Sequence, residues 1–163
     1  MAAVAAQTTT LQTQTTATLA ADVCGHTSVG AGKVITISLT QQEGVFYQDG
    51  CVVQATPVTT GRPALPTPPG NDHVFYKTSP FVMVSMWPPS SPFWYPNSPV
   101  NWVMEFLADG YFLHDAPWES PSQFGAGSEN SGAASHGCIH VPTPVMRWLY
   151  GWTPVGTPVI VSA

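Results

Sequence analysis

The sequence predicts a mainly β, loop-rich fold. The chain of 163 residues contains 14 glycines and 17 prolines, and both residue types interrupt the hydrogen-bond ladder of a helix. Several segments instead alternate apolar and polar residues, which is typical of strands with one buried face. A hydrophobic content of 44% is enough for one core, so we expect a single compact unit.

The first predicted strand covers residues 34–39. Ile35 and Ile37 lie on one face of this segment, whereas Thr36 and Ser38 lie on the other face. This repeat of two residues is the pattern of a half-buried strand. Ordered structure is expected to begin with this strand.

Two Asp-Gly pairs, at residues 49–50 and 109–110, each separate two strand-like segments. Asp-Gly readily adopts the positive φ angles of a type I′ turn, which joins antiparallel strands. We therefore expect hairpins within residues 45–55 and 101–113. The second hairpin would deliver His114 at the end of its second strand, where a loop starts.

Prolines are concentrated in residues 57–99, which hold 11 of the 17 prolines of the chain. Because proline lacks a backbone N–H, this region is expected to form turns, sheet edges and extended loops. Residues 87–102 are also rich in aromatic side chains. We interpret them either as a lid over a cleft or as a rigid loop that packs on the body of the fold.

Near the C-terminus, one short helix is expected at residues 145–150. Thr143 is a suitable N-cap, Pro144 suits the first helical position, and Gly151 is expected to end the helix. Residues 157–161 form the last predicted strand.

Residues 1–30 are expected to be a tether rich in Thr, Ala and Gln, followed by a folded domain at residues 31–163. The tether lacks the positive start and the apolar core of a secretory signal. Thr-rich spacers commonly hold extracellular domains away from a surface, so we expect an exported protein whose signal segment is absent from this sequence. A frayed Ala-rich helix is the alternative interpretation of the segment.

Charge and hydropathy argue against two kinds of partner. Only four residues are Lys or Arg, whereas nine are Asp or Glu, which gives a net charge of −5. An acidic chain is unsuited to binding nucleic acid. The apolar runs fall far short of the roughly 20 residues that a membrane-spanning helix needs. We therefore expect neither a nucleic-acid partner nor a membrane span.

The motif Ser-His-Gly-Cys-Ile-His at residues 135–140 carries the candidate chemistry. A cysteine is a good nucleophile only as the thiolate, so it needs a nearby base and an unobstructed approach. Gly137 leaves the approach to Cys138 open, and His114 or His136 offers a base. The backbone amides of Gly137 and Cys138 are placed to form an oxyanion hole.

Two other interpretations of Cys138 stay open on the residues alone. The first is a buried structural cysteine. The second is a zinc site in which His136, Cys138 and His140 share one face of a strand and His114 supplies a fourth ligand.

The chain has three cysteines, so at most one intramolecular disulfide can form and at least one thiol remains over. If the protein is exported, Cys24 and Cys51 are the candidates to pair, which would join the end of the tether to the first hairpin. The alternative is two unpaired thiols.

The motif at residues 135–138 resembles the signature of the L,D-transpeptidase catalytic domain, a YkuD-type family. The segment His-Asp-Ala-Pro-Trp at residues 114–118 is similar to the segment around the upstream histidine of the mycobacterial-type enzymes. Residues 41–70 resemble the opening hairpin of the family and its Thr-Pro-x-Gly turn. The resemblance covers about residues 31–163, and its separate motifs follow the order of the family.

This resemblance implies a β-sandwich or flattened barrel, with the cysteine on a loop between strands and one short helix after it. It also implies an acyltransferase that forms 3→3 cross-links in peptidoglycan. The thiol attacks a tetrapeptide stem, D-Ala leaves, and an amine of a second stem attacks the thioester. The implied partners are peptidoglycan stem peptides and carbapenem-type inhibitors, and neither step needs a metal or another cofactor.

The resemblance also implies roles for single residues. Cys138 resembles the nucleophile and His114 the general base, whose ring the backbone carbonyl of Asp115 would orient without help from the Asp115 side chain. The residues expected to shape the loop of the nucleophile are Ser135, His136 and Gly137. The residues expected to contact the substrate are Trp118, His140 and Tyr111.

Two features depart from the family pattern. Position 140 usually holds Arg or Asn and here holds His140, and the segment between His114 and Ser135 is longer than usual, so substrate preference can differ. Three alternatives remain: an L,D-carboxypeptidase that uses water as acceptor, a zinc hydrolase, and an inactive cell-wall-binding module. The location of the implied substrate places the protein in the cell envelope or outside the cell.

Overall fold

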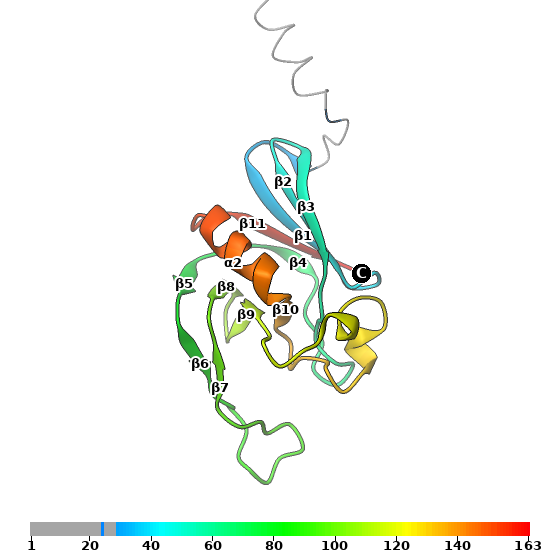
Figure 1. Cartoon of the computed structure of the whole chain (residues 1–163), viewed down its shortest axis with the longest axis vertical. Helices are drawn as coiled ribbons and strands as arrows, with labels where there is room; N and C mark the ends of the chain where they lie inside the picture. The colour runs from blue at the N-terminus through cyan, green and yellow to red at the C-terminus, as the bar shows by residue number, and fades with distance from the viewer. Residues whose placement is uncertain (1–23, 25–28) are drawn as a thin grey trace, which may run out of the picture.

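The structure of this chain is a computed structural model that describes Cys24 and residues 29–163. The expected tether at residues 1–30 therefore lies almost entirely outside the described residues. Within them the chain forms eleven strands, which Figure 1 colours in chain order. Their bounds are β1 (Lys33–Ser38), β2 (Glu43–Gln48), β3 (Cys51–Pro57), β4 (Gly70–His73), β5 (Tyr76–Thr78), β6 (Phe81–Met83), β7 (Ser98–Val100), β8 (Val103–Leu107), β9 (Tyr111–Asp115), β10 (Ile139–Val141) and β11 (Pro158–Ser162).

The strands form two larger sheets and one two-stranded ribbon. The first sheet has the order β3-β2-β1-β11-β4, the second has the order β10-β9-β8-β5, and β6 pairs with β7. Neither larger sheet closes on itself. The mainly β fold is confirmed, and it is an open sandwich because the sheets leave free edges.

Both predicted hairpins are present. The first joins β2 to β3, and the second joins β8 to β9. Asp49 and Gly50 have φ angles of 52° and 80°, and Asp109 and Gly110 have φ angles of 68° and 87°. These left-handed conformations turn the chain sharply enough to pair the flanking strands. The second hairpin carries His114 within β9.

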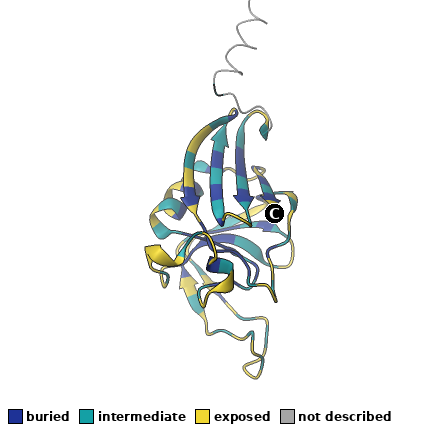
Figure 2. Cartoon of the chain, turned by 90° about the vertical axis from the view of Figure 1, so that its right-hand side faces the viewer, coloured by how far each residue is buried: buried dark blue, intermediate teal, exposed yellow. Residues whose placement is uncertain are grey.

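Apolar residues from both sheets and from the helix form one buried cluster. Figure 2 shows dark blue buried positions alternating with paler positions along several strands. Each large side chain removed from water contributes roughly 1.5–3 kcal/mol. The largest members of this core include Ile35, Ile37, Phe46, Met104, Phe106, Leu113, Ile139, Met146 and Leu149.

The helix α2 (Thr143–Trp152) is longer than the sequence predicts. Thr143 is its first residue and not its N-cap, and the expectation that Gly151 ends the helix is wrong. The amide of Thr153 still donates to the carbonyl oxygen of Leu149 at 2.9 Å, so the helical ladder continues past Gly151. The ring of Trp152 also stacks on the indole four positions earlier, which stabilises the extra turn.

Both lysines of the chain cap the C-terminal end of α2. The ammonium group of Lys33 donates to the carbonyl oxygen of Trp152 at 2.6 Å. The ammonium group of Lys77 donates to the carbonyl oxygens of Tyr150, at 2.5 Å, and Thr153. The last carbonyls of a helix lack intrahelical partners and carry partial negative charge, so each cation stabilises this end by about 0.3–1 kcal/mol.

The proline-rich residues 57–99 form edges and loops, as predicted. Strands β4 and β5 lie at the edges of the two larger sheets, and β6 and β7 form the separate ribbon. The loop between β6 and β7 extends away from the body of the fold in Figure 1.

Cys24 and Cys51 form a disulfide, which joins the chain before β1 to the first residue of β3. Cys138 is the free cysteine of the described residues. None of the helices in the described part of the chain has the length and hydrophobicity required to cross a bilayer.

Candidate active site

Cys138 lies on the turn that leads into β10, and hydrogen bonds hold this turn from two directions. The hydroxyl of Ser135 donates to the carbonyl oxygen of Cys138 at 2.5 Å and accepts from the amide of Gly137 at 3.0 Å. The hydroxyl of Thr67 donates to the carbonyl oxygen of Gly137 at 2.8 Å and accepts from the amide of Gly61 at 2.9 Å. A turn that is distant in sequence therefore supports the loop that carries Cys138.

Gly137 occupies a position where a side chain does not fit. Its φ angle is 116°, and a Cβ atom there would lie 2.7 Å from Cε1 of Tyr111. The ring of Tyr111 packs against this turn and is not among the residues that line the cavity, so substrate contact by Tyr111 stays a prediction without support from the cavity. The alternation of β9 gives the reason: Tyr111 and Leu113 contact the core, whereas His114 faces the cavity.

The oxyanion hole expected from the amides of Gly137 and Cys138 stays a prediction, and one of its two donors has a partner in this arrangement. The amide of Gly137 already donates to the hydroxyl of Ser135, so it is not available to a substrate oxygen in this arrangement. Short hydroxyl side chains compete in this way for nearby backbone amides. An oxyanion hole that uses Gly137 requires that this hydrogen bond opens.

His114 is positioned as a neutral base. Its Nδ1 atom donates to the backbone carbonyl oxygen of Asp115 at 2.7 Å, so Nε2 keeps a free lone pair. The residue is 2% exposed. Burial and the adjacent His140 lower the pKa of His114 to about 3, so its ring is uncharged at neutral pH.

The side chain of Asp115 has a structural role. One carboxylate oxygen accepts from the amides of Asn101 and Trp102 at 2.8 and 3.0 Å, and the other accepts from the side-chain amide of Asn101 at 2.6 Å. Asp115 is fully buried, and these bonds replace the water that it loses. The carboxylate holds the link between β7 and β8, while the backbone carbonyl holds the ring of His114.

Cys138 is a neutral thiol in this arrangement. Its Sγ atom lies 3.6 Å from the carbonyl oxygen of Gly110, and its side chain packs against the apolar cluster of Met83, Val100 and Val103. Burial raises the pKa of the thiol to about 11. Thiol and imidazole are therefore both uncharged at neutral pH, and the thiolate has to form by proton transfer during the reaction.

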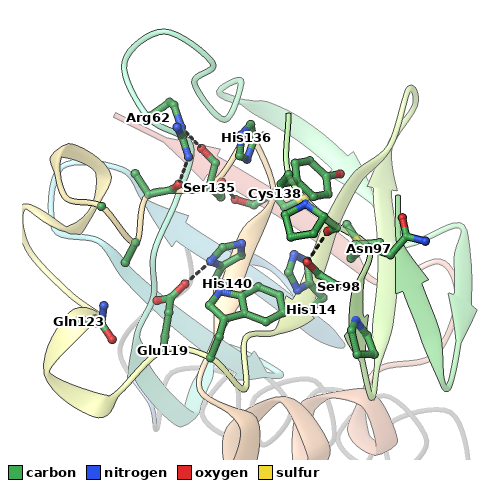
Figure 3. A pocket seen from close by; sticks show the side chains of 18 residues that line it. Arg62, Asn97, Ser98, His114, Glu119, Gln123, Ser135, His136, Cys138 and His140 are labelled. Atoms are coloured by element: carbon green, nitrogen blue, oxygen red, sulfur yellow. Dashed lines mark hydrogen bonds and ion pairs between the residues drawn. The ribbon is translucent and has the colours of Figure 1, made fainter. Parts of the chain in front are cut away.

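These groups line one cavity of about 490 Å³. Figure 3 shows Cys138 and three histidines in its middle, with Asn97 and Ser98 on one side and Glu119 and Gln123 on the other. One wall comes from the loop between β6 and β7, and the opposite wall comes from the loop after β9. The cavity therefore has two flanks around a central thiol.

His136 packs against the aromatic loop before β7. Its ring centroid lies 4.9 Å from that of Tyr95 and 5.5 Å from that of Trp87. Burial lowers the pKa of His136. Residues 87–102 thus contact the site, as the lid interpretation expects, whereas Trp102 at their end packs against the main core.

Trp118 lines the cavity beside two histidines. Its ring centroid lies 6.1 Å from that of His114 and 5.7 Å from that of His140, and the indole is nearly perpendicular to the ring of His140. The indole is 49% exposed. An exposed aromatic face at a cavity can contact a ligand, so substrate binding by Trp118 stays a prediction.

Glu119 belongs to the site although the sequence did not predict it. Its carboxylate forms a hydrogen bond with Nδ1 of His140 and accepts from the hydroxyl of Thr59 at 3.0 Å. Burial raises the pKa of Glu119 to about 7 and lowers the pKa of His140 to about 3. The sequence offered one signal that could have identified Glu119. Only nine residues are Asp or Glu, so each of these acidic residues is a candidate for a specific contact.

Arg62 is a second residue that the sequence did not predict. Its guanidinium group donates to the carbonyl oxygens of Ala134 and Ser135, at 2.6 and 3.1 Å. These bonds fix the chain immediately before the Ser-His-Gly-Cys motif.

A buried glutamine anchors the wall that carries Glu119. Gln42 is fully buried, and its amide group donates to the hydroxyl of Thr60 at 2.7 Å while its oxygen accepts from the hydroxyl of Ser128 at 3.1 Å. Ser128 lies in the long segment between β9 and β10. This segment is therefore tied to the first sheet by satisfied buried polar groups.

The geometry does not favour the zinc interpretation. Among the residues that the structure describes, no group of three or more His, Cys, Asp or Glu side chains is arranged to hold a metal ion. The ring of His136 packs on aromatic side chains, and His140 is bound to Glu119. The candidate ligands therefore do not converge on one point.

Comparison with known protein families decides the assignment. The family model for the L,D-transpeptidase catalytic domain (YkuD) matches residues 32–161. The chain belongs to this family. The resemblance seen in the separate motifs is thereby confirmed, and the L,D-transpeptidase domain accounts for almost all of the described residues.

Known relatives are mycobacterial L,D-transpeptidases. Probable L,D-transpeptidase 3 of Mycobacterium tuberculosis is 34% identical over 120 residues, which are 72% of this chain and 40% of that protein. L,D-transpeptidase 1 of the same organism is 31% identical over 115 residues, which are 69% of this chain and 43% of that protein. The chain spans less than half the length of these curated relatives.

Solved structures of L,D-transpeptidases share the fold. An L,D-transpeptidase from Mycobacterium smegmatis has a TM-score of 0.72 and 31% identity, covering 82% of this chain and 60% of that one. L,D-transpeptidase 3 from Mycobacterium tuberculosis, solved with a faropenem-derived adduct, has a TM-score of 0.71 and 28% identity, covering 82% and 61% of the two chains.

Proposed function

We propose that this L,D-transpeptidase domain forms 3→3 cross-links between peptidoglycan stem peptides through a thioester on Cys138. The proposal rests on one observation: Cys138 and His114 line the same cavity, and the ring of His114 is held with its Nε2 lone pair free. Membership of the family supports the same chemistry. In this proposal residues 31–163 are the catalytic domain and residues 1–30 are a tether.

The first step transfers the acyl group to the enzyme. Nε2 of His114 takes the proton of the Cys138 thiol while Sγ attacks the carbonyl carbon between the diamino acid and the terminal D-Ala. The tetrahedral intermediate then collapses, its C–N bond breaks, and His114 gives the proton to the leaving amine. D-Ala departs and a thioester remains.

The second step transfers the acyl group to an amine. The side-chain amine of a diamino acid on a neighbouring stem attacks the thioester, a C–N bond forms and the C–S bond breaks. The sulfur recovers a proton as the thiol. The thioester conserves the energy of the cleaved peptide bond, so the cross-link needs no separate energy source.

The site residues divide into three tasks in this proposal. Cys138 and His114 react, while Ser135, His136 and Gly137 shape the loop of the nucleophile. Trp118 and His140 contact the substrate. Cross-linking of stem peptides places the domain in the cell envelope, on the outer side of the membrane, with a role in cell-wall formation and cell shape.

Intact-mass spectrometry with a carbapenem tests the nucleophile. Wild-type protein is expected to gain the mass of the carbapenem, and Cys138→Ala is expected to gain none. A tetrapeptide stem ending in D-Ala then tests the reaction itself: a cross-linked dimer identifies a transpeptidase, and a free tripeptide identifies an L,D-carboxypeptidase. Wild-type protein that neither gains the adduct nor releases D-Ala would contradict the proposal.

A further inference from the structure

We propose that Glu119 and His140 form a second acid–base pair in this active site, which takes a proton from the amine of the acceptor stem. The inference rests on the proposed function, because it assigns a base to the second step. It makes His140 a catalytic residue and Glu119 a positioning residue that acts through His140.

The contacts of this pair match those of a histidine that is oriented by a carboxylate. Nδ1 of His140 is bound to one oxygen of Glu119, and the hydroxyl of Thr59 donates to the other oxygen at 3.0 Å. The side chain of Glu119 is 1% exposed and that of His140 is 9% exposed. With Nδ1 engaged, Nε2 of His140 carries the free lone pair, as in other histidine–carboxylate pairs.

The pair lies beside the proposed general base. Strands β9 and β10 are parallel and pair His114 with His140, and their ring centroids are 4.7 Å apart. Glu119, His140 and Cys138 line the same cavity. In Figure 3 Glu119 lies on the flank of Gln123, opposite the flank of Asn97, and His140 lies next to it toward the middle of the cavity. A donor stem bound along one flank therefore leaves the flank of Glu119 for the acceptor.

The second step needs such a base. A primary amine with a pKa near that of lysine, about 10.4, is almost fully protonated at neutral pH and cannot attack a thioester. The acceptor ammonium loses two protons on the way to an amide. One proton goes to Nε2 of His140, and the other passes through His114 to Sγ as the C–S bond breaks. His140 then releases its proton to solvent, so the enzyme returns to its starting state.

Charge explains why His140 needs Glu119. Burial disfavours a positive charge on His140, and His136 and Arg62, which line the same cavity, disfavour it further. Glu119 supplies the opposing negative charge. When it is ionised, Glu119 offsets the positive charge that His140 gains as it accepts the proton of the acceptor amine.

The test compares Glu119→Gln with the matched control Glu129→Gln, which lies on the same long loop but outside the cavity. The probe is a synthetic tetrapeptide stem with a diamino acid at position three and D-Ala at position four. Release of D-Ala reports acylation, and the cross-linked dimer reports transfer. In Glu119→Gln we expect transfer to slow by about 100-fold while acylation stays within about threefold, so that the thioester accumulates in intact-mass spectra.

Two further measurements separate this role from a merely structural one. The pH profile of transfer should lose an inflection near pH 7 in Glu119→Gln, because burial raises the pKa of Glu119 to about 7 and the amide of the variant does not titrate. His140→Asn should show the same selective loss of transfer, and His73→Asn, an exposed control on β4, should not.

Several outcomes would overturn the inference. Equal losses of acylation and transfer in both Glu119→Gln and His140→Asn would show a structural role, and normal transfer in either variant would exclude the pair as a base. Failure of the proposed function itself has a different signature: wild-type protein would release no D-Ala.

Discussion

Nδ1 of His114 lies 2.7 Å from the backbone carbonyl oxygen of Asp115, whose own carboxylate binds the backbone of residues 101–102. One residue therefore serves the site through its backbone and the fold through its side chain. The two roles can be separated by substitution.

Asp115→Ala should destabilise the fold and spare the chemistry. The change leaves the two amide groups of Asn101 and the amide of Trp102 without their acceptor, which costs roughly 2–4 kcal/mol of unfolding free energy. Urea unfolding measures this loss, with Asp72→Ala on the edge strand β4 as control. The backbone carbonyl remains, so folded Asp115→Ala should react with a carbapenem at close to the wild-type rate. A 100-fold slower reaction would assign the carboxylate to catalysis.

Gly137→Ala should disturb the loop of the nucleophile. The new Cβ atom meets the ring of Tyr111 and the backbone has a φ angle of 116°, so we expect a loss of about 1–3 kcal/mol and slower acylation of Cys138. Gly132→Ala is the control, because nothing lies within 4 Å of its Cβ position. Pairing Gly137→Ala with Tyr111→Leu should restore part of the stability, since it relieves the contact but not the backbone strain. Wild-type stability in the single variant would contradict this account.

Alkylation of Cys138 should depend steeply on pH. Burial raises the pKa of this thiol to about 11, so the thiolate fraction grows about tenfold for each pH unit through the neutral range. Iodoacetamide modification, followed by intact mass between pH 6 and 10, measures this slope. A rate that levels off below pH 8 would instead indicate a thiolate–imidazolium pair in the resting enzyme.

Acid should destabilise the fold mainly through His114. Its pKa is about 3 in the fold and near the ordinary 6.5 in the unfolded chain. Below pH 6.5 the unfolded state binds a proton that the folded state does not, so stability declines as the pH falls from 6.5 toward 3. Between pH 7 and pH 5 this amounts to about 2 kcal/mol.

The Glu119 and His140 pair adds little to this pH dependence. The lowered pKa of His140 decreases the stability of the fold in acid, as that of His114 does. The raised pKa of Glu119 has the opposite effect, because between about pH 4.5 and 7 the folded state holds a proton that the unfolded chain lacks. The two effects oppose each other. Urea midpoints at pH 7 and pH 5 should therefore differ clearly in wild-type protein and much less in His114→Gln. An unchanged difference in His114→Gln would assign the acid sensitivity to other groups.

Features set by neighbouring residues were predictable from the sequence. The two Asp-Gly turns fix their hairpins because positive φ angles are a local property of the pair. The end of α2 was not predictable in this way. Lys33 from β1 and Lys77 from β5 bind its last carbonyl groups and so stabilise the helix beyond Gly151.

The site shows the same division. The motif at residues 135–138 and His114 could be predicted from the sequence, because cysteine and histidine are the residue types that supply a nucleophile and a base. Glu119 and Arg62 could not, since each acts through contacts with residues far away in the chain. The hydrogen bond from the amide of Gly137 to the hydroxyl of Ser135 could not be predicted either, because sequence does not reveal how this side chain is oriented.

The lysines that cap α2 have a consequence for the proposed transfer of an acyl group from Cys138 to an amine. The sequence contains only two lysines, and both ammonium groups are engaged with helix carbonyls and lie outside the cavity of Cys138. No lysine side chain is therefore placed to intercept the thioester. The positions of both lysines therefore disfavour acylation of the protein on its own lysine side chains.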